Sequence, residues 1–313
     1  LLSMEGGSLT SELLNHFGCS ADVATSSALV QQRNKISEEA FPMLFRLFVK
    51  KTESPKYYKG LRLIAADGSD IQIPTNPSHL DSYFPGVNGQ ASYNMLHLDA
   101  MYDLLRHTYI DASLVGQRKV NERSSLCSMV DCSSMENVLL VADRGYEGFN
   151  LMAHIQEKRW HFLIRIRDVL NSRGIASGLQ LPDKEEFDLP VCLSLTTKAS
   201  NEVKQLCKDK NKYRYIPSTV SFDYLPKKNR KHDPAIFYEL RFRVVRFKLT
   251  EDTYETVVTN LDTVAFPPKE LKKLYNMRWG IETSFRELKY TVGLMHFHAK
   301  KVEYIYQEVF ARL

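Results

Sequence analysis

The stretch VLLVADRGY, residues 138–146, predicts the centre of the fold. It opens with an unbroken apolar run, which is typical of a strand that is buried on both faces, as in a parallel sheet. Asp143 stands where this run ends. Because open α/β sheets form their sites beyond the carboxyl ends of their strands, Asp143 is the first candidate functional residue.

The segments around this strand predict a mixed sheet. In chain order they are a β-rich segment (61–74), two strands of a hairpin turning at Arg106–His107 (92–105 and 108–115), a short helix (121–131), the strand already described, a helix (150–159) and a strand (160–168). This is the order of a ribonuclease-H-like α/β core, although other α/β folds share it.

Changes of composition divide the chain into four parts. Residues 1–50 are helical, and residues 51–167 hold the first part of the core. Residues 168–262 contain successive strand patterns with polar turns, at 185–197, 213–225, 236–249 and 253–261. Residues 263–313 return to helix after Pro267 and Pro268. We therefore predict an α/β fold: a ribonuclease-H-like mixed sheet flanked by helices, interrupted by a β-rich insertion, with a helical N-terminal segment.

Composition narrows the class of protein. The chain has 313 residues, of which 43% are hydrophobic and 25% charged, and its net charge of +5 is mild. Positive charge gathers with aromatic residues at 157–167 and 241–248, and without them at 226–231, which is typical of nucleic-acid surfaces. Most soluble proteins with this net charge nevertheless bind no nucleic acid.

The cysteines and the apolar runs predict the compartment. Five scattered cysteines form no CxxC pair, so we expect a reducing compartment and no structural zinc. Neither a signal peptide nor an apolar run of about 18 residues is present, so we expect a soluble cytoplasmic protein with no membrane partner. Because the chain lacks an initiator Met and its last residues continue a helical pattern, we expect a fragment of a longer protein.

A late stretch, YNMRWGIETSFRELKYTVGL (275–294), predicts one amphipathic helix. Its apolar stripe consists of Leu274, Met277, Ile281, Phe285, Leu288 and Val292. Beside this stripe, four polar residues fall within about 60° of one another on a helical wheel. These are Tyr275, Arg278, Glu282 and Lys289.

Three acidic residues occupy unusual positions. Asp67 ends the apolar run LIAAD, Asp143 ends VLLVAD, and Glu282 lies on the polar strip. If the three carboxylates converged, they would repel one another at neutral pH unless cations neutralised them. All-oxygen ligands suit Mg²⁺ or Mn²⁺, and two such ions about 4 Å apart can promote phosphoryl transfer.

Each acidic candidate has a structural alternative. An aspartate before glycine is commonly a turn residue. Other aspartates compete with Asp67 for the role, namely Asp70, Asp99, Asp103 and Asp111. Glu282 could instead lie on a solvated face and pair with Arg278 or Arg286.

In combination, these residues resemble a family: insertion-sequence transposases with a DDE catalytic triad, in the group marked by a Tyr–x2–Arg–x3–Glu–x6–Lys pattern. Tyr275, Arg278, Glu282 and Lys289 meet every spacing of that pattern. DGS (67–69) resembles the family's first aspartate motif, VADRGY (141–146) its second, and FLIRIR (162–167) the strand that follows. The β-rich insertion is also a trait of this group, and the resemblance covers roughly residues 25–313.

The resemblance implies a reaction and its partners. Asp67, Asp143 and Glu282 would hold two Mg²⁺ or Mn²⁺ ions, and water would cut DNA at an element end to leave a 3′-hydroxyl. In this group of transposases, the 3′-hydroxyl typically attacks the opposite strand to form a hairpin. The hairpin is reopened before the end is joined to target DNA. No ATP is needed, which agrees with the absence of a GxxxxGK[ST] loop. The implied partners are double-stranded DNA and a second copy of the chain, in the bacterial cytoplasm or nucleoid.

The resemblance also implies the DNA contacts. Arg278 would offer a fork to phosphate, Lys289 a point charge and Tyr275 a hydroxyl. Trp279 would stack near the DNA end, with packing as its alternative, and Arg165 projects from its strand either toward the site or away from it. In the helical N-terminal segment, interpreted as the remnant of a DNA-binding part, residues 31–33 either touch DNA or form a polar helix face.

Two other functions fit the same residues. One is a non-catalytic DNA-binding descendant of a transposase, and the other is a metal-dependent nuclease on the same fold that cuts without strand transfer.

Overall fold

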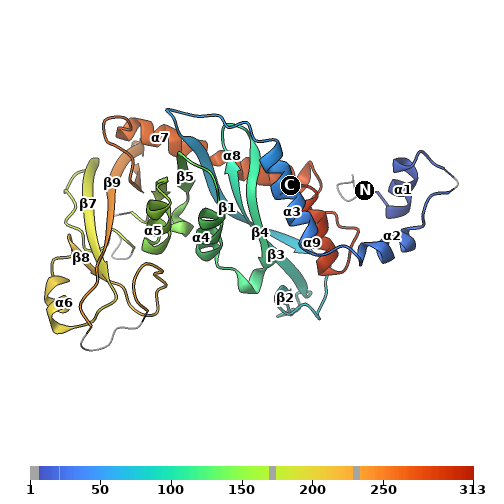
Figure 1. Ribbon diagram of the computed structural model, residues 1–313, viewed down its shortest axis with the longest axis horizontal. Coiled ribbons are helices and arrows are strands. Elements are labelled where there is room, and N and C mark those ends of the chain that lie inside the picture. The colour runs from blue at the N-terminus through green and yellow to red at the C-terminus, as the bar shows by residue number, and fades with distance from the viewer. Residues whose placement is uncertain (1–6, 21, 169–173, 228–232) are drawn as a thin grey trace. The chain divides into compact units, whose positions relative to one another are not determined.

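The computed structural model describes residues 7–20, 22–168, 174–227 and 233–313 (Figure 1). The chain forms two compact units. The first consists of Leu1–Pro55, Asp67–Asn121 and Gly280–Leu313, and the second of Lys56–Ala66 and Glu122–Trp279. Strand β1 (Arg62–Ile73) contributes to both units: its residues up to Ala66 belong to the second unit, and those from Asp67 on belong to the first.

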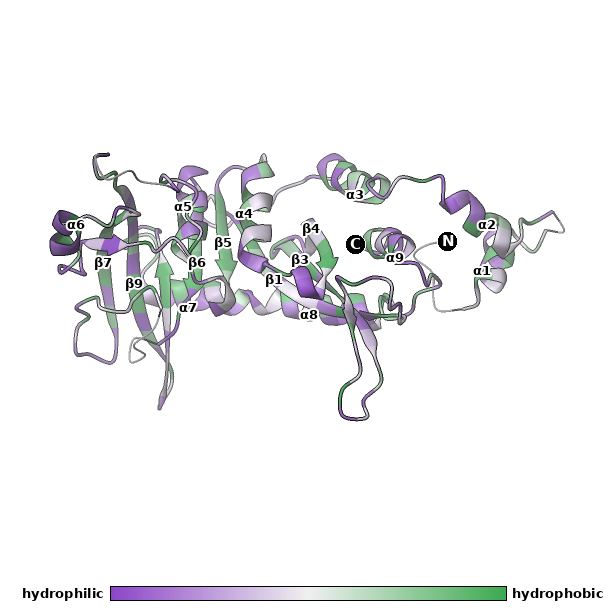
Figure 2. Cartoon of the chain, turned by 90° about the horizontal axis from the view of Figure 1, so that it is seen from below, coloured by the Kyte–Doolittle hydropathy of each residue, from purple (hydrophilic) through white to green (hydrophobic). Residues whose placement is uncertain are grey.

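Parallel strands form the centre of the second unit. The first residues of β1 pair with β5 (Val138–Ala142), and β5 pairs with β6 (His161–Arg165), both in parallel. All five residues of β5 are buried, as the continuous apolar run predicted. Figure 2 shows β5 and β6 as hydrophobic segments. Helices α4 (Glu122–Cys132) and α5 (Phe149–Glu157) pack together in this unit, and both were predicted from sequence.

The strand-rich segment continues this sheet. In the second unit the strand order is β1-β5-β6-β10-β9-β7-β8, and β10 (Thr253–Thr259) pairs antiparallel with both β6 and β9 (Tyr238–Thr250). β9 pairs antiparallel with β7 (Phe187–Thr196), which lies beside it in Figure 1. The short helix α6 (Asn201–Leu206) follows β7.

One predicted strand of this segment is mostly wrong. Of the predicted strand 213–225, only β8 (Tyr213–Tyr215) is extended and paired. Pro217 has no N–H to donate to a ladder, and the Ser-Thr pair after it favours a turn, so the strand ends early. Val220 N donates to Pro217 O at 2.9 Å, which closes that turn.

An antiparallel hairpin dominates the sheet of the first unit. β3 (Tyr93–Asp103) and β4 (Thr108–Gly116) pair along their length, and β3 also neighbours β1 and the short β2 (Tyr83–Phe84). The turn lies where it was predicted. Asp103 Oδ1 accepts the N–H groups of Leu105 and Arg106, both at 3.0 Å, which fixes the turn. The mixed sheet with its hairpin and parallel strands confirms the predicted fold class.

Helices make up the rest of the first unit, and most follow sequence signals. They are α1 (Leu9–His16), α2 (Ser26–Arg33), α3 (Ala40–Lys51), α8 (Trp279–Tyr290, from Gly280 on) and α9 (Val302–Phe310). Ser8 and Thr25 cap α1 and α2 through their side chains, and Pro42 lies in the first turn of α3.

Arg33 fits neither of the two interpretations of residues 31–33. Its guanidinium is buried and forms an ion pair of 3.0 Å with Glu308, and it also donates to Gln307 and to the carbonyl of Tyr304. Arg33 therefore anchors α2 on α9 and is not part of an exposed polar face. Gln31 and Gln32 are exposed.

The predicted single helix over 275–294 is two helices. α7 (Pro268–Met277) ends at Arg278, whose N–H donates to Tyr275 O at 3.0 Å, and α8 begins at Trp279. An i→i−3 bond tightens the chain at this point and interrupts the regular ladder. Val292, assigned to the apolar stripe, lies beyond the end of α8 and is 41% exposed. In the described ranges, no helix is both long enough and apolar enough to cross a membrane.

Candidate active site

Asp67 and Asp143 follow directly on a register pair. Ala66 of β1 and Ala142 of β5 are partners in the parallel ladder, and each aspartate is the next residue along its strand. Asp143 lies at the strand end, as predicted. Asp67 does not, because β1 continues to Ile73; only the fully buried part of the strand ends there. Asp67 is therefore a strand residue, and the interpretation as a turn residue is wrong.

Hydrogen bonds of Arg123 and Glu147, together with one of Asp143 itself, fix the loop that carries Asp143. The Oδ1 atom of Asp143 accepts the N–H of Gly145 at 2.8 Å, and Arg123 Nε donates to the carbonyl of Gly145 at 2.8 Å. Glu147 is buried and accepts the N–H groups of Arg167 and Ile175, at 3.1 and 2.6 Å. Arg123 and Glu147 were not selected from sequence, where Arg123 was only part of a predicted helix start.

The competing aspartates are engaged elsewhere in the first unit. Asp70 Oδ1 lies 2.6 Å from His97 Nδ1, and its Oδ2 accepts from Gln117 at 3.0 Å. Asp99 is buried and lies 3.2 Å from the other ring nitrogen of His97. Asp103 fixes the hairpin turn, and Asp111 pairs with Arg46. That Asp67, and not one of these four aspartates, is the first acidic residue of the site stays a prediction.

Glu282 and Lys289 belong to the part of α8 that lies in the first unit. Glu282 is in the first turn of the helix and is half-buried, as is Lys289 near the other end. Burial lowers the pKa of the Lys289 ammonium, and the negative charge of Asp70 partly opposes that shift. Lys289 is therefore within electrostatic reach of an aspartate on β1.

Tyr275, Arg278 and Trp279 belong to the second unit. Tyr275 is 3% exposed and Arg278 5%, whereas Trp279 is 58% exposed. The guanidinium of Arg278 lies 5.6 Å from the ring centre of Tyr275 and 5.3 Å from that of Trp279. Burial raises the pKa of the Tyr275 hydroxyl to about 12, so the phenol is neutral at physiological pH. Arg278 thus packs between a buried and an exposed aromatic ring.

Arg165 meets an acidic residue that sequence reasoning missed. Its Nε atom lies 3.0 Å from Oε1 of Glu255 on β10, and the Arg165 side chain is 44% exposed while that of Glu255 is 5% exposed. The available signal was a charged residue inside the strand pattern TYETVVTNL, where alternation places Glu255 on the same face as Val257 and Thr259.

The basic segment 241–248 is largely neutralised by the protein itself. Arg243 contacts both carboxylate oxygens of Asp188, at 2.9 and 2.6 Å, and Arg246 lies over the ring of Tyr254 and 3.4 Å from Asp168. Arg241 is exposed and pairs with Glu239. Most of the basic segment 226–231 lies outside the described residues.

The three predicted ligands are of the kind that divalent cations such as Mg²⁺ or Mn²⁺ prefer. Asp67, Asp143 and Glu282 offer only carboxylate oxygens, and all three are half-buried, so they remain accessible to an ion and to water. In each aspartate one oxygen accepts a backbone N–H, of Gly68 at 2.9 Å and of Gly145 at 2.8 Å. Such bonds orient a carboxylate for metal binding.

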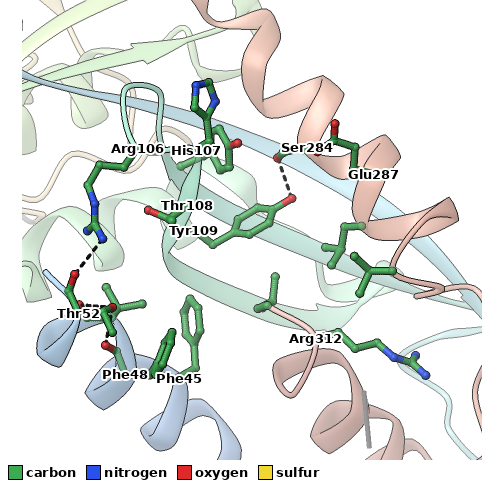
Figure 3. Close-up of a pocket in the computed structure, with 15 residues that line it drawn as sticks. Phe45, Phe48, Thr52, Arg106, His107, Thr108, Tyr109, Ser284, Glu287 and Arg312 are labelled. Atoms are coloured by element: carbon green, nitrogen blue, oxygen red, sulfur yellow. Dashed lines mark hydrogen bonds between the residues drawn. The ribbon is translucent and has the colours of Figure 1, made fainter. Parts of the chain in front are cut away.

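A cavity in the first unit lies away from these residues. It has a volume of about 250 Å³ and lies between α3, the β3–β4 hairpin and α8 (Figure 3). Phe45 and Tyr109 line it, and Ser284 Oγ donates to Tyr109 Oη at 2.8 Å. Its described lining residues include none of the predicted site residues, so we assign it no role in catalysis.

Comparisons with known proteins indicate the family of the chain. The chain is 24% identical over 298 residues to the transposase InsG for insertion sequence element IS4 of Escherichia coli strain K12. The alignment covers 92% of this chain and 58% of that protein. The chain thus spans less than two thirds of that relative. A cryo-EM structure of a piggyBac transposase synaptic complex with hairpin DNA aligns with 99% of this chain and 61% of its own, at a TM-score of 0.46 and 9% identity. A family model described as "Transposase DDE domain" matches residues 58–313, and the chain therefore belongs to the DDE transposase family.

Proposed function

We propose that this chain is the catalytic part of an insertion-sequence transposase that cuts DNA at element ends and joins them to target DNA. Asp67, Asp143 and Glu282 are its triad. The observation that carries the proposal is the register of β1 and β5, which makes Asp67 and Asp143 successors of the paired Ala66 and Ala142. The family membership adds the reaction class, which is phosphoryl transfer.

The triad residues would hold two Mg²⁺ or Mn²⁺ ions. When bound, such ions would activate the attacking oxygen and stabilise the leaving oxygen in an in-line displacement. The role of the protein is to orient the carboxylates. Gly145 N and Gly68 N each fix one carboxylate oxygen, and Arg123 and Glu147 hold the loop after β5.

We assign the chain to the group with the Tyr–Arg–Glu–Lys pattern, whose spacings it meets at Tyr275, Arg278, Glu282 and Lys289. Arg165 and Trp279 are exposed and Lys289 is half-buried, so direct DNA contact is proposed first for these three. Tyr275 and Arg278 are buried, and they would act indirectly, since Arg278 packs against the ring of Trp279 and Tyr275 packs against Arg278.

The proposed partners are double-stranded DNA ends, target DNA and a second copy of the chain. Two element ends must be brought together before joining, and a homodimer gives each end its own site. The proposed setting is the bacterial cytoplasm and nucleoid.

One experiment separates the proposal from its alternatives. The chain is incubated with Mg²⁺, a supercoiled target plasmid and duplexes carrying the inverted repeats that flank its coding region. Joined product supports a transposase. Cleavage without joining indicates a nuclease, and binding without cleavage indicates a non-catalytic descendant; either result contradicts the proposal.

A further inference from the structure

Glu255 lies beside Arg165, one of the residues proposed to contact DNA. It comes from β10, next to β6, and Val257 two residues later is the register partner of Arg165. The Arg165 guanidinium lies 3.0 Å from its carboxylate. Tyr275 on α7 is close enough for both charges to act on its hydroxyl. Residues from two strands and a helix therefore gather at one buried carboxylate.

The charges around Glu255 do not balance. Burial raises the pKa of its carboxyl group, and the positive charges of Arg165, Arg278 and Lys272 oppose that shift. Among these four side chains, three positive charges face one negative charge. Three basic side chains therefore lie within electrostatic reach of this one carboxylate.

A second arginine of the same sheet, Arg243, forms an ion pair that is shielded from solvent. Arg243 is 6% exposed, contacts both oxygens of Asp188, and donates to the carbonyls of Leu261 and Phe266. Its donors are consumed within the protein. Arg165 differs, because a single close contact through Nε leaves its side chain 44% exposed. Its outer nitrogen atoms are accessible to a ligand from solution.

We propose that Glu255 is a positioning residue for phosphate binding: it holds the guanidinium of Arg165 in one orientation on β6, so that the exposed nitrogen atoms bind a DNA phosphate. The inference rests on the proposed function, which supplies DNA as the ligand. Glu255 itself does not contact the phosphate, because the two negative charges repel. Its effect is to reduce the freedom that Arg165 loses on binding.

A double-mutant cycle tests this role. The 313-residue chain is compared with Arg165→Ala, Glu255→Asp and the double variant, by fluorescence anisotropy with a random duplex of about 30 base pairs at one salt concentration without divalent ions. Glu255→Asp keeps the charge and withdraws the carboxylate by one methylene, so simple electrostatics predict no change. We expect Arg165→Ala to weaken binding about tenfold in the wild-type background, as for one charge-assisted contact, and less than about threefold beside Glu255→Asp.

Equal losses in the two backgrounds would overturn the inference, and so would an Arg165→Ala variant that binds like wild type. Asp188→Glu is the matched control, because it alters a partly buried carboxylate opposite Arg243; beside it, Arg165→Ala should keep its full effect. If thermal unfolding shows that Glu255→Asp does not fold, the cycle is run with Glu255→Gln under the same criterion. If the wild-type chain does not bind the duplex, both proposals are refuted. If it binds with the expected cycle but does not cleave DNA, only the catalytic proposal is refuted.

Discussion

Ala66 of β1 and Ala142 of β5 are register partners in a parallel pair, and an aspartate follows each of them. Parallel partners lie at the same level of a sheet, so Asp67 and Asp143 are the next residues along two neighbouring strands. One of these strands ends and the other continues. Two acidic residues at neighbouring positions repel each other unless a cation neutralises them, which is the physical basis of the metal proposal.

Replacing a triad carboxylate by its amide should abolish cleavage and spare DNA binding. In Asp143→Asn and Glu282→Gln, shape is kept but the charge that attracts the ions is lost. We expect a fall in cleavage rate of about a thousandfold or more, because bound ions contribute several kcal/mol. Gel assays give the cleavage rate, and anisotropy gives the affinity. Asp70→Asn is the control, because Asp70 already contacts His97 and Gln117. Loss of binding together with cleavage would contradict the assignment and indicate a role in folding.

The strands and short helices were predictable because their signals are local. The run at 138–142 is apolar throughout, and the hairpin pattern is broken by the Arg106–His107 turn. The pairing of β10 with β6 was not predictable, since it depends on residues more than 80 positions apart. The break at Arg278 was also missed, because the apolar spacing continues across it and Gly280, two residues later, lies inside the next helix.

The Arg33–Glu308 pair should carry much of the stability that ties α2 to α9. Both side chains are nearly inaccessible, at 4% and 0% exposure, so removing one leaves the other charged and buried. We expect Arg33→Ala to lower the free energy of unfolding by about 3–5 kcal/mol. Urea denaturation measures this change. Arg46→Ala breaks a more exposed pair with Asp111 and should lower it by less than about 1 kcal/mol; similar losses in the two variants would refute the distinction.

The site residues show where sequence reasoning reaches its limit. A helical wheel placed Tyr275 and Arg278 on a polar strip, but both are buried in the second unit. The wheel gives an angular position only; it cannot show that strand β10 supplies Glu255 as a partner for the nearby charges. Spacing indicated which residue types matter, whereas their partners depend on tertiary contacts.

Asp223 should make stability sensitive to acid. Hydrogen bonds from Asn150 and His154 lower the pKa of its carboxyl group below the ordinary value of 3.8. A lowered pKa means that the ionised form stabilises the fold above pH 3.8 and that this stabilisation is lost as the pH falls through the folded-state pKa. Asp223→Asn should therefore be less stable than wild type at pH 7, with a smaller difference at pH 3. Urea unfolding at both pH values is the measurement, and exposed Asp252→Asn is the control. An unchanged difference would contradict this role.

The salt dependence of DNA binding should distinguish exposed arginines from those that the protein has already neutralised. Each phosphate contact contributes about 0.9 to the slope of log affinity against log salt, because counterions leave the DNA when the contact forms. Arg165 retains an exposed side chain, so Arg165→Ala should lower the magnitude of that slope by about 1. Arg243 belongs to the basic segment 241–248, but it is 6% exposed and contacts both carboxylate oxygens of Asp188, and Arg243→Ala should leave the slope unchanged. Anisotropy titrations of the wild type and both variants between about 50 and 200 mM salt give the three slopes. If Arg243→Ala reduces the slope as much as Arg165→Ala does, the charge compensation seen in the fold does not survive binding, and this prediction is wrong.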